Sequence, residues 1–156
     1  MAQSDKLTPA DIRVLRLLQR DLDSTKQELA EMAGMSPSTL WRRVHEMEEI
    51  GAIRKRVALL DPNVIGFPTC VFLSVNLAGH EKVVREQFEE FVMQTPQIME
   101  CFSITGAFDY MLIVRARSVS EFETFLMERV LGHKSVASAV SQVALRQHKY
   151  STEFPI

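Results

Sequence analysis

The 156-residue sequence contains no apolar run that approaches the about 20 residues needed to cross a bilayer. Its N-terminus also lacks the basic and apolar regions of a secretory signal peptide, because Asp5 and Asp11 stand close to Lys6. We therefore expect a cytoplasmic protein with no membrane partner.

Cysteine is scarce as well. The only two cysteines, Cys70 and Cys101, stand far apart, lie in β-prone stretches and form no CxxC motif. This pattern favours buried free thiols over a disulfide, and we expect no metal site. A metal sensor that combines these cysteines with histidines is the alternative.

The sequence also lacks the motifs of common catalytic sites. Its histidines are scattered, and it contains neither a Gly-rich phosphate loop nor an HExxH motif. No Ser/His/Asp or Cys/His group can be assembled from it. We therefore expect neither an enzyme nor a cofactor. The four histidines are His45, His80, His133 and His148.

The net charge of −2 argues only weakly against a nucleic-acid partner, because an average over the chain hides how charge is distributed. Residues 1–60 contain ten Lys and Arg against nine Asp and Glu, whereas residues 61–156 contain eight against eleven. Five of the basic residues stand close together, where phosphates could be bound. These five are Arg42, Arg43, Arg54, Lys55 and Arg56.

The stretch from Ser36 to Gly51 is typical of a capped helix. Ser36 can accept a hydrogen bond from the first turn, Pro37 suits the first helical position, and Gly51 can end the helix in a left-handed conformation. An apolar stripe is formed by Leu40, Val44, Met47 and Ile50. The outward residues are then Ser38, Thr39, Arg42, Arg43 and Glu46.

Two further helices are predicted before this stretch. One begins after Thr8 and Pro9, and the next is capped by Thr25, turns Leu29, Met32 and Ala33 inward, and stops at Gly34. A helix, a short turn containing Gly34 and a second helix with basic outward residues form the helix-turn-helix pattern, whose second helix enters the major groove of double-stranded DNA. The alternative is an ordinary helical hairpin in which Arg42 and Arg43 are only solvated.

Residues 53–60 form a β-prone run with the basic centre Arg54, Lys55 and Arg56. A strand here would make a wing beside the helices and bring its cations to DNA phosphates. The alternative is a charged edge strand that prevents aggregation. We expect residues 1–60 to form a winged helix-turn-helix domain and residues 61–68, with two prolines and Gly66, to form a linker.

The second part, residues 69–156, alternates strand and helix patterns. Strands are expected at residues 69–77, 98–105, 110–116 and 135–147, and helices at residues 81–95 and after Ser118 or Ser120. This order matches the ferredoxin-like βαββαβ motif. The expected fold class is therefore α+β. A ferredoxin-like domain can also serve catalysis, so a metabolic enzyme is a second alternative.

The whole chain resembles the Lrp/AsnC family of transcriptional regulators. The resemblance is carried by an ordered set of short motifs, of which none is diagnostic alone. They are Leu29-Ala30, Ser36-Pro37, Arg43-Val44, Met47-Glu48, Gly51-Ala52-Ile53, Ala58-Leu59-Leu60-Asp61-Pro62, Gly66, Thr105-Gly106 and Phe108-Asp109-Tyr110.

The resemblance implies a sequence-specific regulator whose second domain is of the RAM type, binds an effector and forms oligomers. It implies homodimers paired through their C-terminal sheets, assembly into an octamer or a similar ring, and an amino acid or related metabolite bound between dimers. DNA contacts are expected from Ser36, Ser38, Thr39, Arg42, Arg43, Glu46, Arg54, Lys55 and Arg56, and effector contacts from Thr105, Gly106, Ala107, Phe108, Asp109 and Tyr110.

Three points stay open within this resemblance. Asp109 either binds the ammonium group of the effector or holds the turn. Many relatives have an acidic residue after the turn glycine, where this chain has Ala107, so the site either prefers a more apolar ligand or binds no amino acid. The alternative function is an architectural DNA-binding protein with little ligand control.

Overall fold

The computed structural model describes residues 7–20 and 24–156, which form two units. The first unit comprises the N-terminal part to Ala58 together with Lys149–Ile156, and the second is Leu59–His148. Each unit has its own hydrophobic core. None of the described helices is long and apolar enough to cross a membrane.

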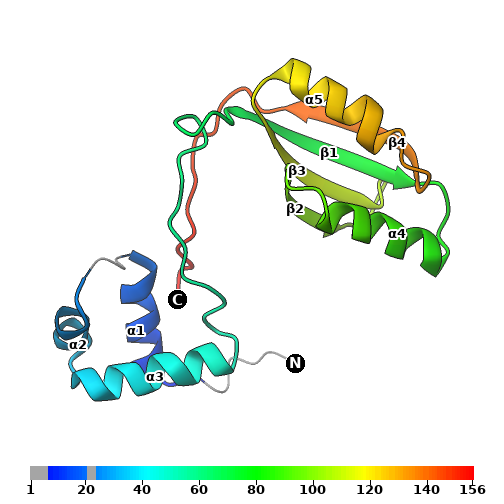
Figure 1. The fold of residues 1–156 in the computed structure, drawn as a ribbon. Coiled ribbons are helices and arrows are strands. Elements are labelled where there is room, and N and C mark those ends of the chain that lie inside the picture. The colour runs from blue at the N-terminus through cyan, green and yellow to red at the C-terminus, as the bar shows by residue number, and fades with distance from the viewer. Residues whose placement is uncertain (1–6, 21–23) are drawn as a thin grey trace. The chain divides into compact units, whose positions relative to one another are not determined.

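The first unit contains three helices, α1 (Pro9–Arg20), α2 (Lys26–Ala33) and α3 (Pro37–Glu49), which appear in blue to cyan in Figure 1. Their ends follow the predicted caps. The hydroxyl oxygen of Ser36 accepts from the Thr39 amide over 3.3 Å, and Gly34 takes a φ of 68° after α2. At α2, the Thr25 side chain and Glu28 form a reciprocal capping box.

The core of this unit joins all three helices around Val14, Leu40 and Val44, which are almost fully buried. The prediction that Met32 and Ile50 point inward is wrong, since they are 54% and 38% exposed. In the short α2 the buried face contains Leu29, Ala30 and Ala33, and Met32 lies beside that face. Ile50 follows the last helical residue, so the periodicity of α3 no longer sets its direction.

The prediction of a strand at residues 53–60 is also wrong. Residues 54–60 have no regular secondary structure, and the described residues provide no backbone hydrogen bond to them. A strand requires a partner whose N–H and C=O groups it can pair with, and no described segment pairs with these residues in this way. The basic tripeptide therefore lies on an exposed, unpaired segment.

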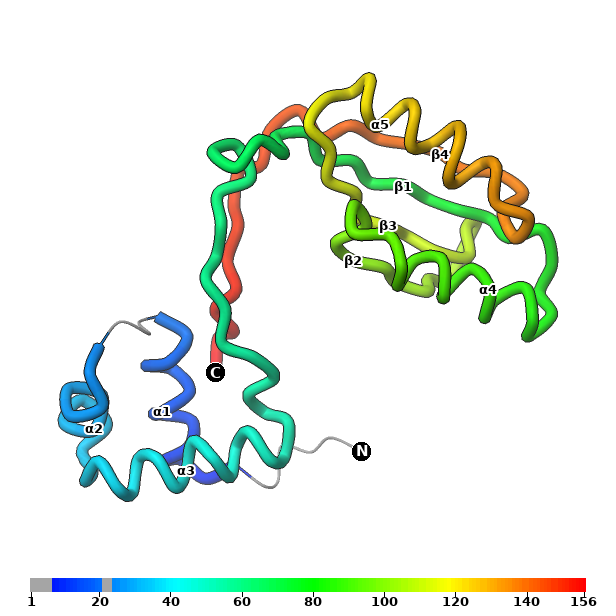
Figure 2. The backbone as a smooth tube through the Cα atoms, in the orientation of Figure 1, coloured from blue at the N-terminus to red at the C-terminus, as the bar shows by residue number. Residues whose placement is uncertain are grey.

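The chain returns to the first unit at its C-terminus, where the tail contacts α1 (Figure 2). The Gln19 side chain forms two hydrogen bonds with the backbone of Phe154. Its Oε1 accepts from the amide over 2.7 Å, and its Nε2 donates to the carbonyl over 3.3 Å. Arg20 pairs with Glu153 over 2.6 Å, and Arg16 donates to the carbonyl of Ile156. The last residues are thus part of the helical unit.

The second unit is a four-stranded antiparallel sheet with helices on one face, as predicted for an α+β ferredoxin-like order (Figure 1). The strand order is β2-β3-β1-β4. The elements are β1 (Thr69–Leu77), α4 (Lys82–Met93), β2 (Ile98–Ser103), β3 (Tyr110–Ala116), α5 (Val119–Phe125), its π-helical continuation η2 (Leu126–Val130) and β4 (Val136–Val143).

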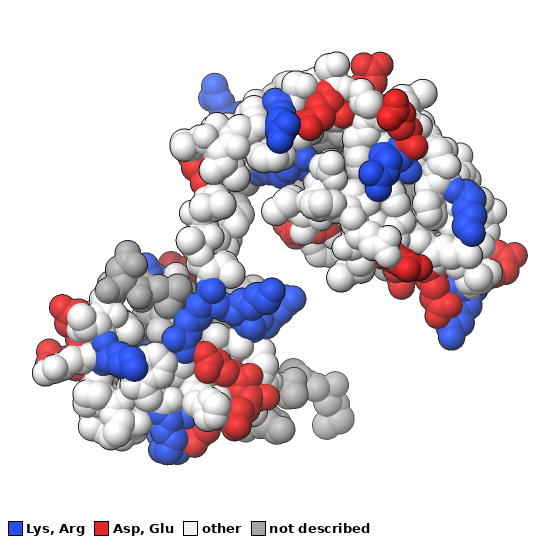
Figure 3. All heavy atoms as spheres, in the orientation of Figure 1, with Lys and Arg blue, Asp and Glu red and all other residues white. Residues whose placement is uncertain are grey.

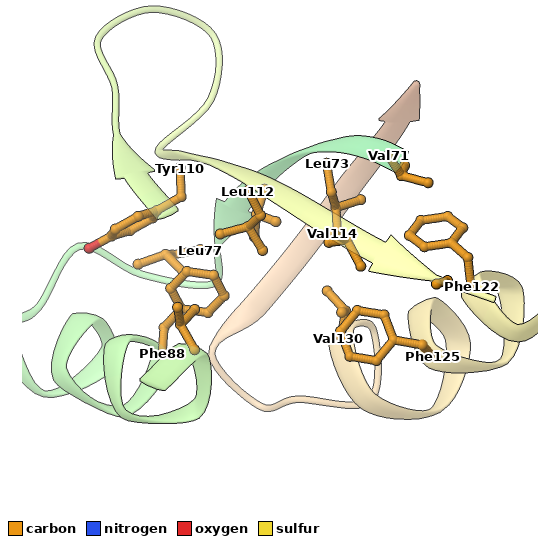
Figure 4. Close-up of a cluster of buried hydrophobic side chains, with 13 residues drawn as sticks. Val71, Leu73, Leu77, Phe88, Tyr110, Leu112, Val114, Phe122, Phe125 and Val130 are labelled. Atoms are coloured by element: carbon orange, nitrogen blue, oxygen red, sulfur yellow. The ribbon is translucent and has the colours of Figure 1, made fainter. Parts of the chain in front are cut away.

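The core of the second unit lies between the sheet and its helices (Figure 4). Alternate residues of the central strands, such as Leu73 and Leu112, point toward the helices, where they meet Phe88 of α4 and Phe122 of α5. None of the described helices covers the opposite face (Figure 1). Its apolar residues Phe72, Phe102 and Val140 are exposed.

Candidate DNA interface and effector site

The start of α3 presents a group of short hydroxyl side chains. The Ser36 hydroxyl oxygen lies 3.1 Å from that of Ser38 and 2.9 Å from that of Thr39. Ser36 is therefore occupied as the helix cap, while Ser38 and Thr39 stand on the first turn. Hydroxyls in this place can reach phosphates or base edges when the helix enters a groove.

One turn further along α3, Arg42 and Glu46 form an i,i+4 pair. The guanidinium Nη1 lies 2.5 Å from the Glu46 carboxylate, and the side chains are 61% and 50% exposed. Exposed pairs of this kind contribute little to stability, so DNA can replace the contact at small cost. Arg42 is thus an exposed cation on α3 that pairs with Glu46 in the free protein.

Arg43 has a different environment from Arg42. Its Nη1 donates to Oδ1 of Asp11 over 2.8 Å and to the Thr8 hydroxyl over 3.2 Å. Burial alone would raise the pKa of Asp11, but hydrogen bonds from Thr8 and Arg43 outweigh it and hold that pKa below 3.8. Arg43 therefore joins α3 to the start of α1, a role that the outward periodicity did not indicate.

The segment after α3 carries the other predicted phosphate contacts. Within the described residues, Arg54 and Lys55 are exposed and form no ion pair, whereas Arg56 donates to Glu48 over 2.5 Å. Figure 3 shows Lys and Arg side chains gathered on the visible face of the first unit, with acidic side chains beside them. Positive charge is thus concentrated locally in the first unit, although the chain as a whole has a net charge of −2.

Sequence reasoning missed one basic residue near α3. Lys26, the first residue of α2, has its ammonium nitrogen 4.4 Å from the centre of the Trp41 ring, and the Arg56 guanidinium carbon lies 5.1 Å from it. Trp41 also packs against the helical core, as expected for this side chain. No sequence signal links Lys26 to Trp41, because their proximity arises only when α2 and α3 fold together.

The predicted effector segment forms the turn between β2 and β3. Gly106 has a φ of 125°, which a residue with a side chain rarely adopts, and Thr105, Gly106 and Ala107 are exposed. Phe108 and Asp109 are partly buried. The exposed part of the turn would need a second surface to enclose a ligand.

Asp109 holds this turn against the end of β1. Its Oδ2 accepts from the Leu77 amide over 2.8 Å, and its own amide donates to the Val75 carbonyl over 3.0 Å. Its other carboxylate oxygen lies 3.9 Å from Nδ1 of His80. One carboxylate oxygen of Asp109 therefore holds the turn to β1, and the other oxygen faces the exposed His80.

Tyr110 faces the core and not the turn. Its ring lies 4.9 Å from that of Phe88, and its hydroxyl donates to Glu89 over 2.7 Å. Burial, together with this hydrogen bond to Glu89, raises the pKa of Tyr110 to about 12. Only its backbone is placed to take part in an exposed site at the turn.

A surface hollow of about 580 Å³ lies elsewhere in the second unit, between α4 on one side and η2 with the residues after it on the other. Phe91 and His133 stack within it at 4.8 Å, and carboxylates, amides and cations line the rest. It does not include the turn at Gly106. The described residues place no group of three or more His, Cys, Asp or Glu to hold a metal ion, and Cys70 and Cys101 are free thiols.

The first unit has the architecture of helix-turn-helix DNA-binding domains, with hydroxyl and basic groups on the exposed side of the second helix of the motif. It is followed by an α+β unit with an exposed turn at Gly106. These features define a class, the DNA-binding regulators that carry a second domain for a small molecule.

Comparisons with known proteins identify the family. Residues 7–54 match a winged helix-turn-helix DNA-binding domain, and residues 70–154 match the Lrp/AsnC ligand binding domain. The glutamate uptake regulatory protein of Zymomonas mobilis is 32% identical over 151 residues, which are 97% of this chain and 92% of that protein. The chain belongs to the Lrp/AsnC family, and it is a DNA-binding transcriptional regulator and not an enzyme.

Solved structures agree with this assignment. A transcriptional regulator from Neisseria meningitidis, crystallised as a complex with L-methionine, has a TM-score of 0.90 and 32% identity, and the match covers 96% of each chain. An AsnC family regulator from Agrobacterium tumefaciens has a TM-score of 0.89 and 34% identity over 96% of this chain and 97% of that one. The protein thus carries a small-molecule effector domain of the same kind.

Proposed function

We propose that the protein binds its operator as a homodimer that places one α3 helix in each of two successive major grooves. Ser38, Thr39, Arg42 and Glu46 face the bases, and Arg54 and Lys55 contact phosphates. The observation that supports this arrangement is the contrast between the exposed Arg42 and the internally paired Arg43. A single helical unit with so few free cations binds a half-site weakly, so affinity depends on two units acting together.

The dimer forms through the uncovered face of the sheet. That face carries the exposed residues Phe72, Phe102 and Val140. Ile113 lies opposite Phe72 and Met111 lies opposite Phe102, and both are only partly buried. Apolar residues in adjacent strands make a continuous surface that water solvates poorly. Dimers paired in this way then assemble into an octamer or a similar ring, which brings the turns at Gly106 to the contacts between dimers.

The effector is an amino acid with an uncharged side chain, bound between dimers at residues 105–110. Backbone groups at the exposed turn bind its carboxylate or ammonium group, and Asp109 keeps the turn in shape. Ala107 supports an apolar preference, because no carboxylate follows the turn glycine. The regulator from Neisseria meningitidis, with its L-methionine complex, is consistent with such a ligand.

An amino-acid screen tests this function. The purified protein is melted with each of the twenty amino acids, and the ligands that raise its melting temperature are examined by sedimentation velocity. A ligand shared between dimers stabilises the assembly. An uncharged amino acid should therefore raise the melting temperature. It should also either raise the sedimentation coefficient or change the distribution of oligomers. If no amino acid changes either quantity while operator binding is normal, the protein is architectural and the effector proposal is wrong.

A further inference from the structure

The surroundings of Trp41 differ from those of an ordinary core aromatic residue. The ring packs against the helical core, yet the Lys26 ammonium and the Arg56 guanidinium lie 4.4 Å and 5.1 Å from its centre. These distances are within the range in which the ring quadrupole attracts cations. Two cations from different segments thus meet one aromatic side chain.

The two cations belong to the segments that meet the DNA backbone in a helix-turn-helix complex. Lys26 is the first residue of α2, the helix that crosses the backbone, and Arg56 belongs to the basic segment after α3. Within the described residues Lys26 has no ion pair, whereas Arg56 is also held by Glu48. Both positive charges therefore lie beside Trp41 of α3.

We propose that Trp41 is a positioning residue that holds Lys26 and Arg56 ready to contact DNA phosphates on either segment beside α3. This proposal rests on the DNA binding described above. Long basic side chains lose conformational freedom when they bind, and a side chain that is already held loses less. A guanidinium beside an aromatic ring can still donate from its N–H groups, as Arg56 does to Glu48.

A ring that only fills space would act differently. Leucine would then replace Trp41 without any change in the contribution of Lys26 to DNA affinity. A positioning ring instead couples the two residues, and phenylalanine, which keeps an aromatic face, restores most of the affinity that leucine loses. The coupling and the rescue by phenylalanine are therefore the diagnostic measurements.

The experiment measures the affinity of the full-length protein for a duplex selected with the wild type, over a range of salt concentrations. Trp41→Leu should weaken binding about fivefold, and Trp41→Phe less than about twofold. Lys26→Gln should weaken binding in the wild-type background and lower the salt slope by about 0.9, but should have little further effect on affinity in Trp41→Leu. Thermal melting confirms that each variant is folded.

A fluorescence measurement keeps the test valid if Trp41→Leu does not fold. Trp41 is the only tryptophan in the chain, so its quenching by acrylamide reports this site alone. Phosphates bound at Lys26 and Arg56 would cover the ring, and the duplex should reduce its quenching in the wild type but less in Lys26→Gln. The proposal would be overturned, with DNA binding intact, if the duplex left the quenching of Trp41 unchanged. It would also be overturned if Lys26→Gln reduced DNA affinity by the same factor in the wild type and in Trp41→Leu. A wild type that binds no duplex would overturn both.

Discussion

Arg43 of α3 donates to Asp11 at the start of α1 over 2.8 Å, and the two side chains are only 24% and 10% exposed. This pair links α3, the second helix of the helix-turn-helix motif, to α1, the helix that precedes the motif. An arginine in such an environment stabilises the orientation of α3, and its removal leaves a buried carboxylate without its charged partner.

Asp11→Asn should lower the free energy of unfolding of the first unit by about 1–2 kcal/mol at pH 7. Urea unfolding followed by Trp41 fluorescence measures this quantity, because the only tryptophan lies in the first unit. Glu31→Gln on the exposed side of α2 is the matched control and should leave the value unchanged. Equal stability of Asp11→Asn and the wild type would contradict the role of the pair.

The same pair predicts a pH dependence. Because the folded pKa of Asp11 lies below its ordinary value of 3.8, the ionised carboxylate stabilises the fold above that value. This stabilisation is lost as the pH falls from 3.8 through the lower folded pKa. The wild type should therefore lose more stability than Asp11→Asn over this range, and parallel pH profiles would show that Asp11 does not contribute.

Asp109→Asn and Asp109→Ala separate the two roles of this residue. Asparagine keeps an oxygen that can accept from the Leu77 amide, whereas alanine leaves that amide without its acceptor. Alanine should therefore lower the stability of the second unit by about 1–3 kcal/mol, and asparagine by much less. Calorimetry of the two variants measures the difference.

The amino-acid response of the same variants completes this comparison. If Asp109 acts by holding the turn, Asp109→Asn should retain the shift in melting temperature that the active amino acid produces. A folded Asp109→Asn that loses this shift would instead assign the carboxylate to the ammonium group of the effector.

Gln19→Ala should release the C-terminal tail from α1. Because Gln19 binds both the N–H and the C=O of Phe154, its loss should speed hydrogen exchange of the Phe154 amide to the rate of an exposed segment. Nuclear magnetic resonance measures this rate directly. Arg13→Ala, on the same helix and with an exposed side chain, should leave it unchanged. Slow exchange in Gln19→Ala would mean that other contacts hold the tail.

Local signals in the sequence predicted most of the elements. Thr25, Ser36 and Gly34 marked helix ends because caps act through neighbouring backbone groups. The strand from Thr69 to Leu77 was predicted with its observed bounds, because alternate residues face the core. The turn glycine Gly106 was likewise visible as the link between two β-prone runs.

The features that were missed depend on residues far apart in the chain. Periodicity placed Arg43 outward, but could not show that α1 brings Asp11 to it from 32 positions away. The β-prone run at residues 53–60 has strand propensity but no partner strand among the residues that the structure describes, and propensity alone does not form a ladder. The contact of Lys26 with Trp41 and that of Gln19 with Phe154 arise in the same way from tertiary packing.

The most direct test of DNA reading by α3 compares Arg42→Ala and Lys55→Ala on a selected operator and on a scrambled duplex. Arg42→Ala should reduce the preference for the operator by about 1–3 kcal/mol, because one base contact is lost. Lys55→Ala should weaken binding to both duplexes equally and lower the salt slope by about 0.9. If both variants retain wild-type affinity and preference, α3 and the segment after it do not form the DNA interface.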